Sequence, residues 1–223
     1  MTKNSLKKAN EGGRYEKKHS YLWGLLVFFL LILIDQLTKL FADVYFSSEG
    51  APKKIAIIPN WISLCITYNR GIAYGMGAHT SPTAKIAVII GTAVMMTALT
   101  ILYFKLDNRR RLLKIALVFV VGGGVGNLID RVHYRVWDST TTLGVRDMVD
   151  LSRFGFAVCN FADFFITAGA VMLVLSFLFF DKDAFFPLGR YKALAKEAEE
   201  QEEKKHAEKQ AKKQAKKAAK KGN

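Results

Sequence analysis

Residues that commonly carry redox, metal-binding or nucleophilic chemistry are scarce in this 223-residue sequence. Its two cysteines, Cys65 and Cys159, are too few for a disulfide framework, and no C-x-x-C pair or Cys/His cluster indicates zinc. The sequence leaves open whether they pair, and two unpaired thiols are the favoured interpretation. The four histidines are scattered, and neither G-x-S-x-G nor H-E-x-x-H occurs. A serine or zinc protease is therefore not predicted, and aspartic chemistry is the enzymatic option that stays open.

Charged residues are missing from several long apolar runs. The chain is 51% hydrophobic and has a formal charge of +14, but its lysines and arginines gather at the two ends and in one middle loop. This separation predicts a small polytopic membrane protein with basic edges, and not a nucleic-acid-binding domain. The glycine-rich segment 122–126 follows no predicted strand and does not match G-x-G-x-x-G, so nucleotide binding is excluded. Its glycines would let membrane helices approach closely.

The apolar runs predict a membrane α-helical fold with four transmembrane helices. The clearest is the second, where 19 uncharged residues run from Ile86 to Phe104, enough to cross a bilayer core. The first could be mistaken for a signal peptide, but no cleavage site of small residues follows it, so it is predicted to be retained. The expected membrane domain covers residues 21–181, with spans at about 21–45, 84–104, 112–131 and 160–180.

The basic residues predict how the chain is oriented. Six Lys/Arg lie in residues 1–20, five in 105–114 and thirteen from residue 182 onward, against three in each of the two other loops. The positive-inside rule therefore predicts that residues 1–20 and 182–223 are cytoplasmic tails. The Lys/Ala-rich C-terminal tail is expected to be helical from about residue 204. Attraction to anionic lipid is one interpretation of it, and a solvated tail with no specific partner is the favoured one.

A β pattern interrupts the helical ones between the first two spans. Ile55–Ile58, then Pro-Asn, then period-2 alternation over residues 61–68 predict a small extracytoplasmic β-hairpin. Trp61 and Tyr68 suit a position where an aromatic ring meets both lipid and water.

Three carboxylates, Asp147, Asp150 and Asp163, stand beside the last apolar run. An ionisable group where a membrane helix begins is costly to desolvate, which makes it a functional-site hypothesis. Two carboxylates held close in a partly dry site share a proton, and the resulting acid and base can activate water to cleave an amide. The alternative is structural, with a solvated loop carboxylate and a helix N-cap at Asp163.

Other polar residues are predicted to gather with these carboxylates. The expected orientation places Asn69, Asn127, Arg131, Asp147, Asn160 and Asp163 near the outer face, and this convergence from separate segments favours a site. Asp35 and Lys39 are spaced i, i+4 on the first span and can neutralise each other there. For this pair the favoured interpretation is a structural ion pair that braces helix packing.

Five short motifs together resemble those of one protein family. They are DQLTK at 35–39, NRGIAYGMG at 69–77, GGGVGNLIDR at 122–131, VRDMVD at 145–150 and NFAD at 160–163. In this order and spacing they resemble the lipoprotein signal peptidases, or signal peptidase II, which are bacterial four-helix membrane aspartyl proteases. The resemblance covers about residues 21–180. It implies cleavage of prolipoprotein signal peptides just before the diacylglyceryl-modified cysteine, with no metal or organic cofactor.

The resemblance also implies roles for individual residues. Asp147 and Asp163 match the catalytic pair, whereas Asp150 matches a carboxylate that the family does not require. Asp35 and Lys39 match a supporting pair, and the hairpin matches an outer β-cradle that helps to seat substrate. Positions that shape the site or hold substrate are matched by Asn69, Gly122, Asn127, Asp130, Arg131, Asn160 and Ala162. The expected setting is the bacterial inner membrane, with prolipoproteins and lipids as partners, no nucleic acid, and a monomeric chain.

The sequence departs from the family pattern at a few positions. Arg146 replaces a usual valine before Asp147, Cys159 replaces a phenylalanine, and Phe164 stands where Ser or Thr is common. Arg146 would favour ionisation of the neighbouring aspartate. Two rival functions are a small transporter, which would be expected to show repeats or broken helices, and a catalytically inactive protein of the same fold. The chain has no internal repeat, and both aspartates are present.

Overall fold

The structure is a computed structural model that describes residues 3–71, 76–77, 79–108, 110–180, 184–189, 191–193, 195–196, 200 and 203, with side chains from residue 21 onward. The chain divides into two compact units, Met1–Met172 and Leu173–Asn223, with the boundary inside the last helix. Residues 191–193 and 195–196 are helical, and the Lys/Ala-rich tail from residue 204 lies outside the described residues.

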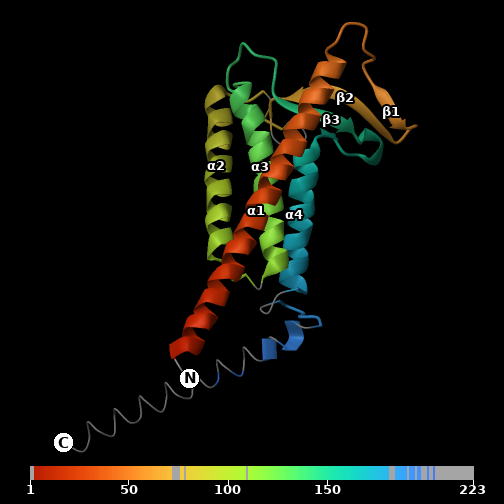
Figure 1. Ribbon diagram of the computed structural model, residues 1–223. Coiled ribbons are helices and arrows are strands. Elements are labelled where there is room, and N and C mark those ends of the chain that lie inside the picture. The colour runs from red at the N-terminus through yellow and green to blue at the C-terminus, as the bar shows by residue number, and fades with distance from the viewer. Residues whose placement is uncertain are drawn as a thin grey trace, which may run out of the picture. The chain divides into compact units, whose positions relative to one another are not determined.

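Four helices are long and apolar enough to cross a membrane, which confirms the predicted fold class. They are α1 (Lys3–Phe46), α2 (Pro82–Lys105), α3 (Arg111–His133) and α4 (Phe161–Leu178) (Figure 1). The first begins earlier than predicted, because the polar N-terminal segment continues the helix, and its membrane-spanning part is Tyr21–Phe46. The remaining three begin and end within about two residues of the predicted spans.

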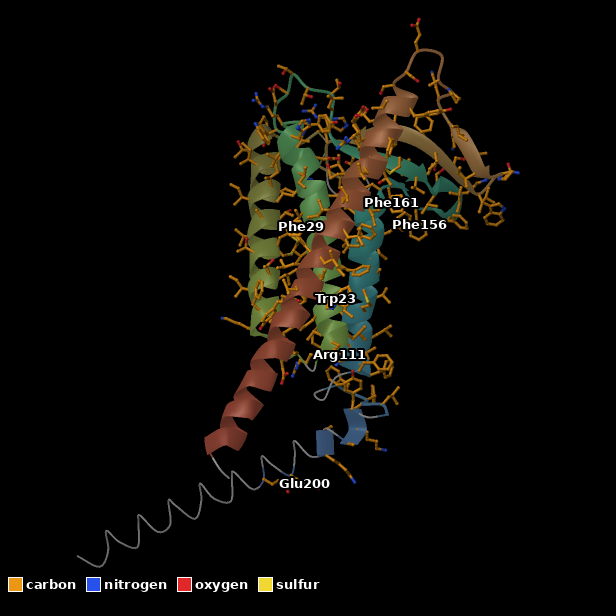
Figure 2. All side chains as sticks on the ribbon, in the orientation of Figure 1. Trp23, Phe29, Arg111, Phe156, Phe161 and Glu200 are labelled. Atoms are coloured by element: carbon orange, nitrogen blue, oxygen red, sulfur yellow. The ribbon has the colours of Figure 1, made fainter. Side chains whose placement is uncertain are left out.

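Large apolar side chains cover the outer surfaces of these helices. Trp23 is 65% exposed and Phe29 is 63% exposed, and Figure 2 shows both on α1 with many other apolar side chains. A soluble protein rarely exposes so continuous an apolar surface. These faces are therefore the surfaces that contact lipid, which makes the chain a multi-pass membrane protein.

The central helix of the first unit is α3. It packs against α1 and α2, and its Gly123 lies against the start of α4. A Cβ added at Gly123 would lie 2.4 Å from the backbone oxygen of Ala162 and 2.8 Å from a side-chain carbon of Ile166. A Cβ added at Gly126 would lie 2.5 Å from Oδ2 of Asp35 on α1. The predicted close approach of helices at this glycine run is thus present, and it brings α4 and α1 to the same part of α3.

Gly123→Ala is expected to lower the free energy of unfolding by about 1–3 kcal/mol, because the new methyl group would meet backbone atoms that cannot rotate away. Gly91→Ala on α2 is the matched control, since a Cβ there meets nothing within 4 Å. That control is expected to be neutral or slightly stabilising, as alanine favours helix over glycine. Titration of both variants with SDS in mixed micelles measures the difference, and equal stabilities would contradict the close packing.

A four-stranded antiparallel sheet, in the order β1-β2-β3-β4, lies at the end of the helices where α4 begins (Figure 1). The predicted hairpin is present as β1 (Ile55–Ile58) and β2 (Ile62–Asn69), and Asn60 adopts a positive φ of 64° in its turn. Asparagine tolerates this left-handed conformation better than most residues.

The sequence analysis missed the other two strands, β3 (Val145–Asp150) and β4 (Val158–Cys159). In the register of β2 and β3, Thr67 pairs with Asp147 and Asn69 pairs with Val145. Every residue of β3 is buried. The sheet therefore fixes Asp147 beside β2 instead of leaving it in a solvated loop.

Candidate active site

Asp147 occupies the middle of the buried strand β3 and is only 4% exposed. The side-chain amide of Asn160 donates a hydrogen bond of 2.6 Å to its Oδ1, and the side chain of Asn69 also bonds to the carboxyl group. Asn69 is the last residue of β2, and its Oδ1 accepts the N–H of Gly71 at 2.9 Å. Asn69 thus acts both as the expected turn residue and as a partner of Asp147.

Asp163 lies in the first turn of α4. Its Oδ1 accepts a hydrogen bond of 2.8 Å from the side-chain amide of Asn127, and its Oδ2 accepts one of 3.1 Å from the backbone N–H of Asn160. In return, the N–H of Asp163 donates to Oδ1 of Asn160 at 3.2 Å. The first turn of a helix is also where its dipole stabilises negative charge. Asp163 is therefore held in a fixed position as an acceptor.

Two asparagines join the carboxylates into one network. The amide nitrogen of Asn160 that contacts Asp147 also lies 3.1 Å from Oδ1 of Asn127, while the amide nitrogen of Asn127 donates to Asp163. Lys39 donates to the same Oδ1 of Asn127 at 3.0 Å. The structure therefore brings together five residues that the sequence places on four separate segments. Asn160 and Asn127 fix the geometry of the aspartate pair from both sides.

The two carboxylates also interact electrostatically. Burial first, and then the negative charge of Asp163, raise the pKa of Asp147 to about 7, against the opposing effect of hydrogen bonds from Asn160 and Asn69. At neutral pH Asp147 therefore carries a proton for a large part of the time. A carboxyl that can hold a proton near neutral pH, beside a second carboxyl, is the arrangement that acid–base catalysis requires.

A chain of buried charges lies beside this network. Lys39 contacts Asp35 at 2.8 Å and Asp130 at 3.5 Å, and all three side chains are fully buried. The other oxygen of Asp35 accepts the backbone N–H of Ala162 at 2.9 Å, next to Asp163. The predicted pair is present, and it extends to Asp130 of α3 and to the start of α4. These contacts connect α1 to α3 and to the start of α4 beside the candidate site.

Arg146 does not act on Asp147, so that expectation was wrong. Its guanidinium contacts Asp130 at 2.8 Å and the side chain of Gln36 at 3.2 Å, on the other face of β3. Successive residues of a strand point to opposite faces, which separates the Arg146 charge from its neighbour. The pKa of Asp147 is accordingly raised and not lowered. Arg146 and Gln36 are site-supporting residues whose role the sequence analysis missed, although Gln36 lies within the DQLTK motif and Arg146 within VRDMVD.

Asp150 lies apart from the pair. It bonds to the exposed Lys54 and accepts the N–H of Ser152 at 2.8 Å. The bond from Lys54, followed by that from Ser152, lowers the pKa of Asp150 to about 2. A carboxylate that is always ionised cannot alternate between acid and base near neutral pH, in agreement with its omission from the predicted pair.

Two predicted site residues remain. Arg131 lies next to the hydrogen-bonded network, and Gly122 lies away from it. Arg131 donates to the backbone oxygens of Asn127 and Gly71, both at 3.2 Å, and so links α3 to the segment that follows β2. Gly122 instead faces Leu31 of α1, where an added Cβ would lie 3.1 Å from the leucine side chain. Gly123 and Gly126, which the sequence analysis did not single out, are the glycines that face α4 and Asp35.

Neither cysteine is in a disulfide, which agrees with the favoured interpretation. Cys159 donates from Sγ to the backbone oxygen of Val149 at 3.6 Å, and burial raises its pKa to about 12. A thiol of this kind is a poor nucleophile. Within the described ranges, no group of three or more His, Cys, Asp or Glu side chains could hold a metal ion.

Comparison with known proteins connects this arrangement to one family. The sequence profile described as Signal peptidase (SPase) II matches residues 27–179. The chain is 33% identical to the lipoprotein signal peptidase of Pseudomonas fluorescens, covering 74% of this chain and 91% of that protein. It is 31% identical to the lipoprotein signal peptidase of Chlorobium phaeobacteroides, covering 69% of this chain and 88% of the relative.

Solved structures show the same fold. Two bacterial membrane enzymes crystallised by the in meso method superpose on the chain with TM-scores of 0.54 and 0.53, each at 24% identity. The first covers 70% of this chain and 92% of its own, and the second covers 69% and 85%. With a family match over most of its length and four membrane-spanning helices, the chain belongs to the signal peptidase (SPase) II family of membrane peptidases.

Proposed function

We propose that this protein is an aspartic endopeptidase that removes the signal peptide from diacylglyceryl-modified prolipoproteins, cutting just before the lipidated cysteine. One observation carries the proposal: Asp147 and Asp163 belong to a single hydrogen-bonded network at the end of a membrane-spanning bundle. The names of the relatives, lipoprotein signal peptidases, support the substrate class.

The two aspartates take different roles in the mechanism. Asp163, ionised, removes a proton from a water molecule as that water attacks the scissile carbonyl. Asp147, protonated at neutral pH because its pKa is about 7, polarises the carbonyl oxygen. Asp147 then gives its proton to the leaving amine. The tetrahedral intermediate collapses to a free carboxyl on the signal peptide and a free amine on the cysteine, while Asp163 holds the proton taken from water.

Neighbouring residues hold the pair without taking part in proton transfer. Asn127 and Asn160 keep each carboxylate in place through amide N–H donors of 2.6–3.1 Å. Because these donors are fixed before substrate arrives, little reorganisation is needed during the reaction. Arg131 steadies the segment after β2 next to Asn127. The substrate reaches the site laterally from the bilayer, with its acyl chains against the helices.

The topology of the proposal follows from the basic residues. Both termini are cytoplasmic, and the aspartate pair lies near the outer face of the bacterial inner membrane. The sheet that carries Asp147 then lies on the outer side, where Trp61 and Phe154 contact each other with ring centroids 5.2 Å apart. Exposed aromatic rings at this level are typical of residues that meet the membrane interface. The enzyme is proposed to work as a monomer.

Mass spectrometry of the products tests the proposed reaction. Purified full-length protein is incubated with a diacylglyceryl-modified prolipoprotein and, in parallel, with the same precursor lacking the lipid. The expected result is one cut immediately before the modified cysteine in the first sample only. Cleavage at another bond, or equal cleavage of the unmodified precursor, would overturn the assignment.

Cleavage is expected to decline as pH rises through about 7. The raised pKa of Asp147 keeps its active, protonated form populated up to about pH 7, and above this value both carboxylates are charged. The kcat/KM measured from pH 6 to 9 should approach a tenfold fall per pH unit on the alkaline side. Asp150→Asn is the control, since the pKa of Asp150 is about 2 and its charge does not change in this range. A flat profile would contradict the role assigned to Asp147.

A further inference from the structure

A cavity of about 230 Å³ next to the candidate active site is lined by three cationic side chains. They are Arg70, which follows β2, Lys85 in the first turns of α2, and Arg131 near the end of α3. Ala84 and Val88 of α2 form an apolar part of the wall. The cavity therefore combines a cationic region with a surface that belongs to a membrane-spanning helix.

Lys85 has no partner in this cavity among the residues that the structure describes. The residue is only 8% exposed; its backbone N–H donates to Ser81 at 3.2 Å, but within the described residues its ammonium group forms neither a hydrogen bond nor an ion pair. A lysine charge that lines a cavity beside two arginines is disfavoured by like-charge repulsion unless an anion is present. Such a group at a membrane-helix end is a sign of a ligand that supplies the missing negative charge.

The two arginines of the cavity donate to backbone oxygens. Arg70 donates from Nη2 to the backbone oxygens of Val136 at 3.2 Å and Asp138 at 2.6 Å, while its buried Nε has no partner in the described part of the chain. Arg131 donates to two backbone oxygens. Neither guanidinium forms an ion pair with any described carboxylate. Arg131 is attracted by the charges of Asp163, Asp147 and Asp130, so Arg70 and Lys85 are the cavity cations without a buried carboxylate partner in the described part of the chain.

We propose that this cavity binds the phosphate group of an anionic phospholipid. Arginine and lysine are the side chains that recognise phosphate, and the N-terminus of α2 adds its positive dipole end. Ala84 and Val88 continue the wall down the membrane span, where an acyl chain would lie and where a soluble acidic peptide would gain nothing. These apolar residues favour a lipid headgroup over a peptide or a free ion.

The site lies outside the proposed reaction but next to it. Arg131 contacts the backbone oxygen of Asn127, whose side chain donates to Asp163. A lipid bound here would neutralise positive charge beside the substrate path without touching either aspartate. The inference goes beyond the proposed function, and a binding measurement tests it without any measurement of cleavage.

Native mass spectrometry of the full-length protein in a neutral detergent tests the proposal, with dioctanoyl phosphatidylglycerol as the probe. Lys85→Met removes the unpartnered charge at nearly constant volume and is expected to weaken binding of the first lipid about tenfold. Lys85→Arg should restore most of the affinity. Lys105→Met is the matched control, since Lys105 is an exposed lysine at the other end of α2, and it should leave the affinity unchanged.

Three further probes identify the source of the anion. Dioctanoyl phosphatidylcholine, which has no net charge, is expected to bind at least tenfold more weakly than the anionic lipid in the wild-type protein. Inorganic phosphate or an acidic peptide that displaced the anionic lipid at a similar concentration would overturn the lipid assignment. Equal binding of phosphatidylglycerol by wild type and Lys85→Met would overturn the site itself.

Discussion

Asp163→Asn is expected to abolish signal-peptide cleavage, lowering kcat by about 10³-fold or more, because the amide cannot take a proton from the attacking water. Asp147→Asn should have a comparable effect, since its amide cannot deliver the proton that the leaving amine needs. Both replacements keep the size of the side chain and one oxygen acceptor. Asp147→Asn can therefore retain the bond from Asn160, and Asp163→Asn can retain the bond from Asn127 while losing the one from the Asn160 N–H. A gel-shift assay on a lipid-modified prolipoprotein measures the loss.

Asp150→Asn is the matched control for these variants. It makes the same change on the same strand as Asp147, but its carboxylate is bonded to Lys54 and lies outside the amide network. Its cleavage rate should stay within about twofold of the wild type, since surface ion pairs contribute little. Thermal unfolding of all three variants checks that they are folded. Persistent cleavage by Asp147→Asn or Asp163→Asn would exclude the aspartic mechanism.

The membrane helices could be predicted from the sequence because their signal is local. A run such as Ile86–Phe104 contains no charge and is long enough to cross the bilayer, so no distant contact is needed to recognise it. The hairpin at β1 and β2 was also predictable, since Pro59 and Asn60 mark its turn.

Strand β3 was not predictable in the same way. Its sequence VRDMVD places charged residues on both faces of the strand, and all six residues are buried. The alternation of apolar and polar residues identifies only strands with one wet face. In β3, Arg146 and Asp147 are buried against partners from other elements, Asp130 and Asn160. Those partners are set by the tertiary structure, which local sequence does not reveal.

The candidate site shows the same limit. Spacing along the chain did not bring Asp147 to Asp163; the family resemblance suggested the pair, and the structure supplies the link through Asn127 and Asn160. The Asp35 and Lys39 pair was predictable because i, i+4 residues share a helix face. Its extension to Asp130 depends on the packing of α1 against α3 at glycines such as Gly126, where a larger side chain would meet Asp35.

Lys39→Met is expected to lower the free energy of unfolding by about 3–5 kcal/mol. The fully buried Lys39 contacts two carboxylates, of Asp35 and Asp130, and donates to Asn127. Its removal leaves buried negative charge that Arg146 offsets at Asp130 but not at Asp35, and an uncompensated buried charge is among the largest single costs to stability. SDS titration in mixed micelles measures the change. Cleavage should also fall, because Asn127 loses a bond that fixes its side chain beside Asp163.

Lys54→Met is the control that separates the cost of stranding buried charge from the cost of losing an exposed ion pair. Lys54 also contacts an aspartate, Asp150, but its side chain is 52% exposed, so water replaces the lost partner and the expected cost is below about 1 kcal/mol. The double variant Asp35→Asn with Lys39→Met should be more stable than Lys39→Met alone, since it removes one stranded carboxylate. A cost for Lys39→Met as small as that for Lys54→Met would mean that the buried charges do not hold α1, α3 and α4 together around the aspartate pair.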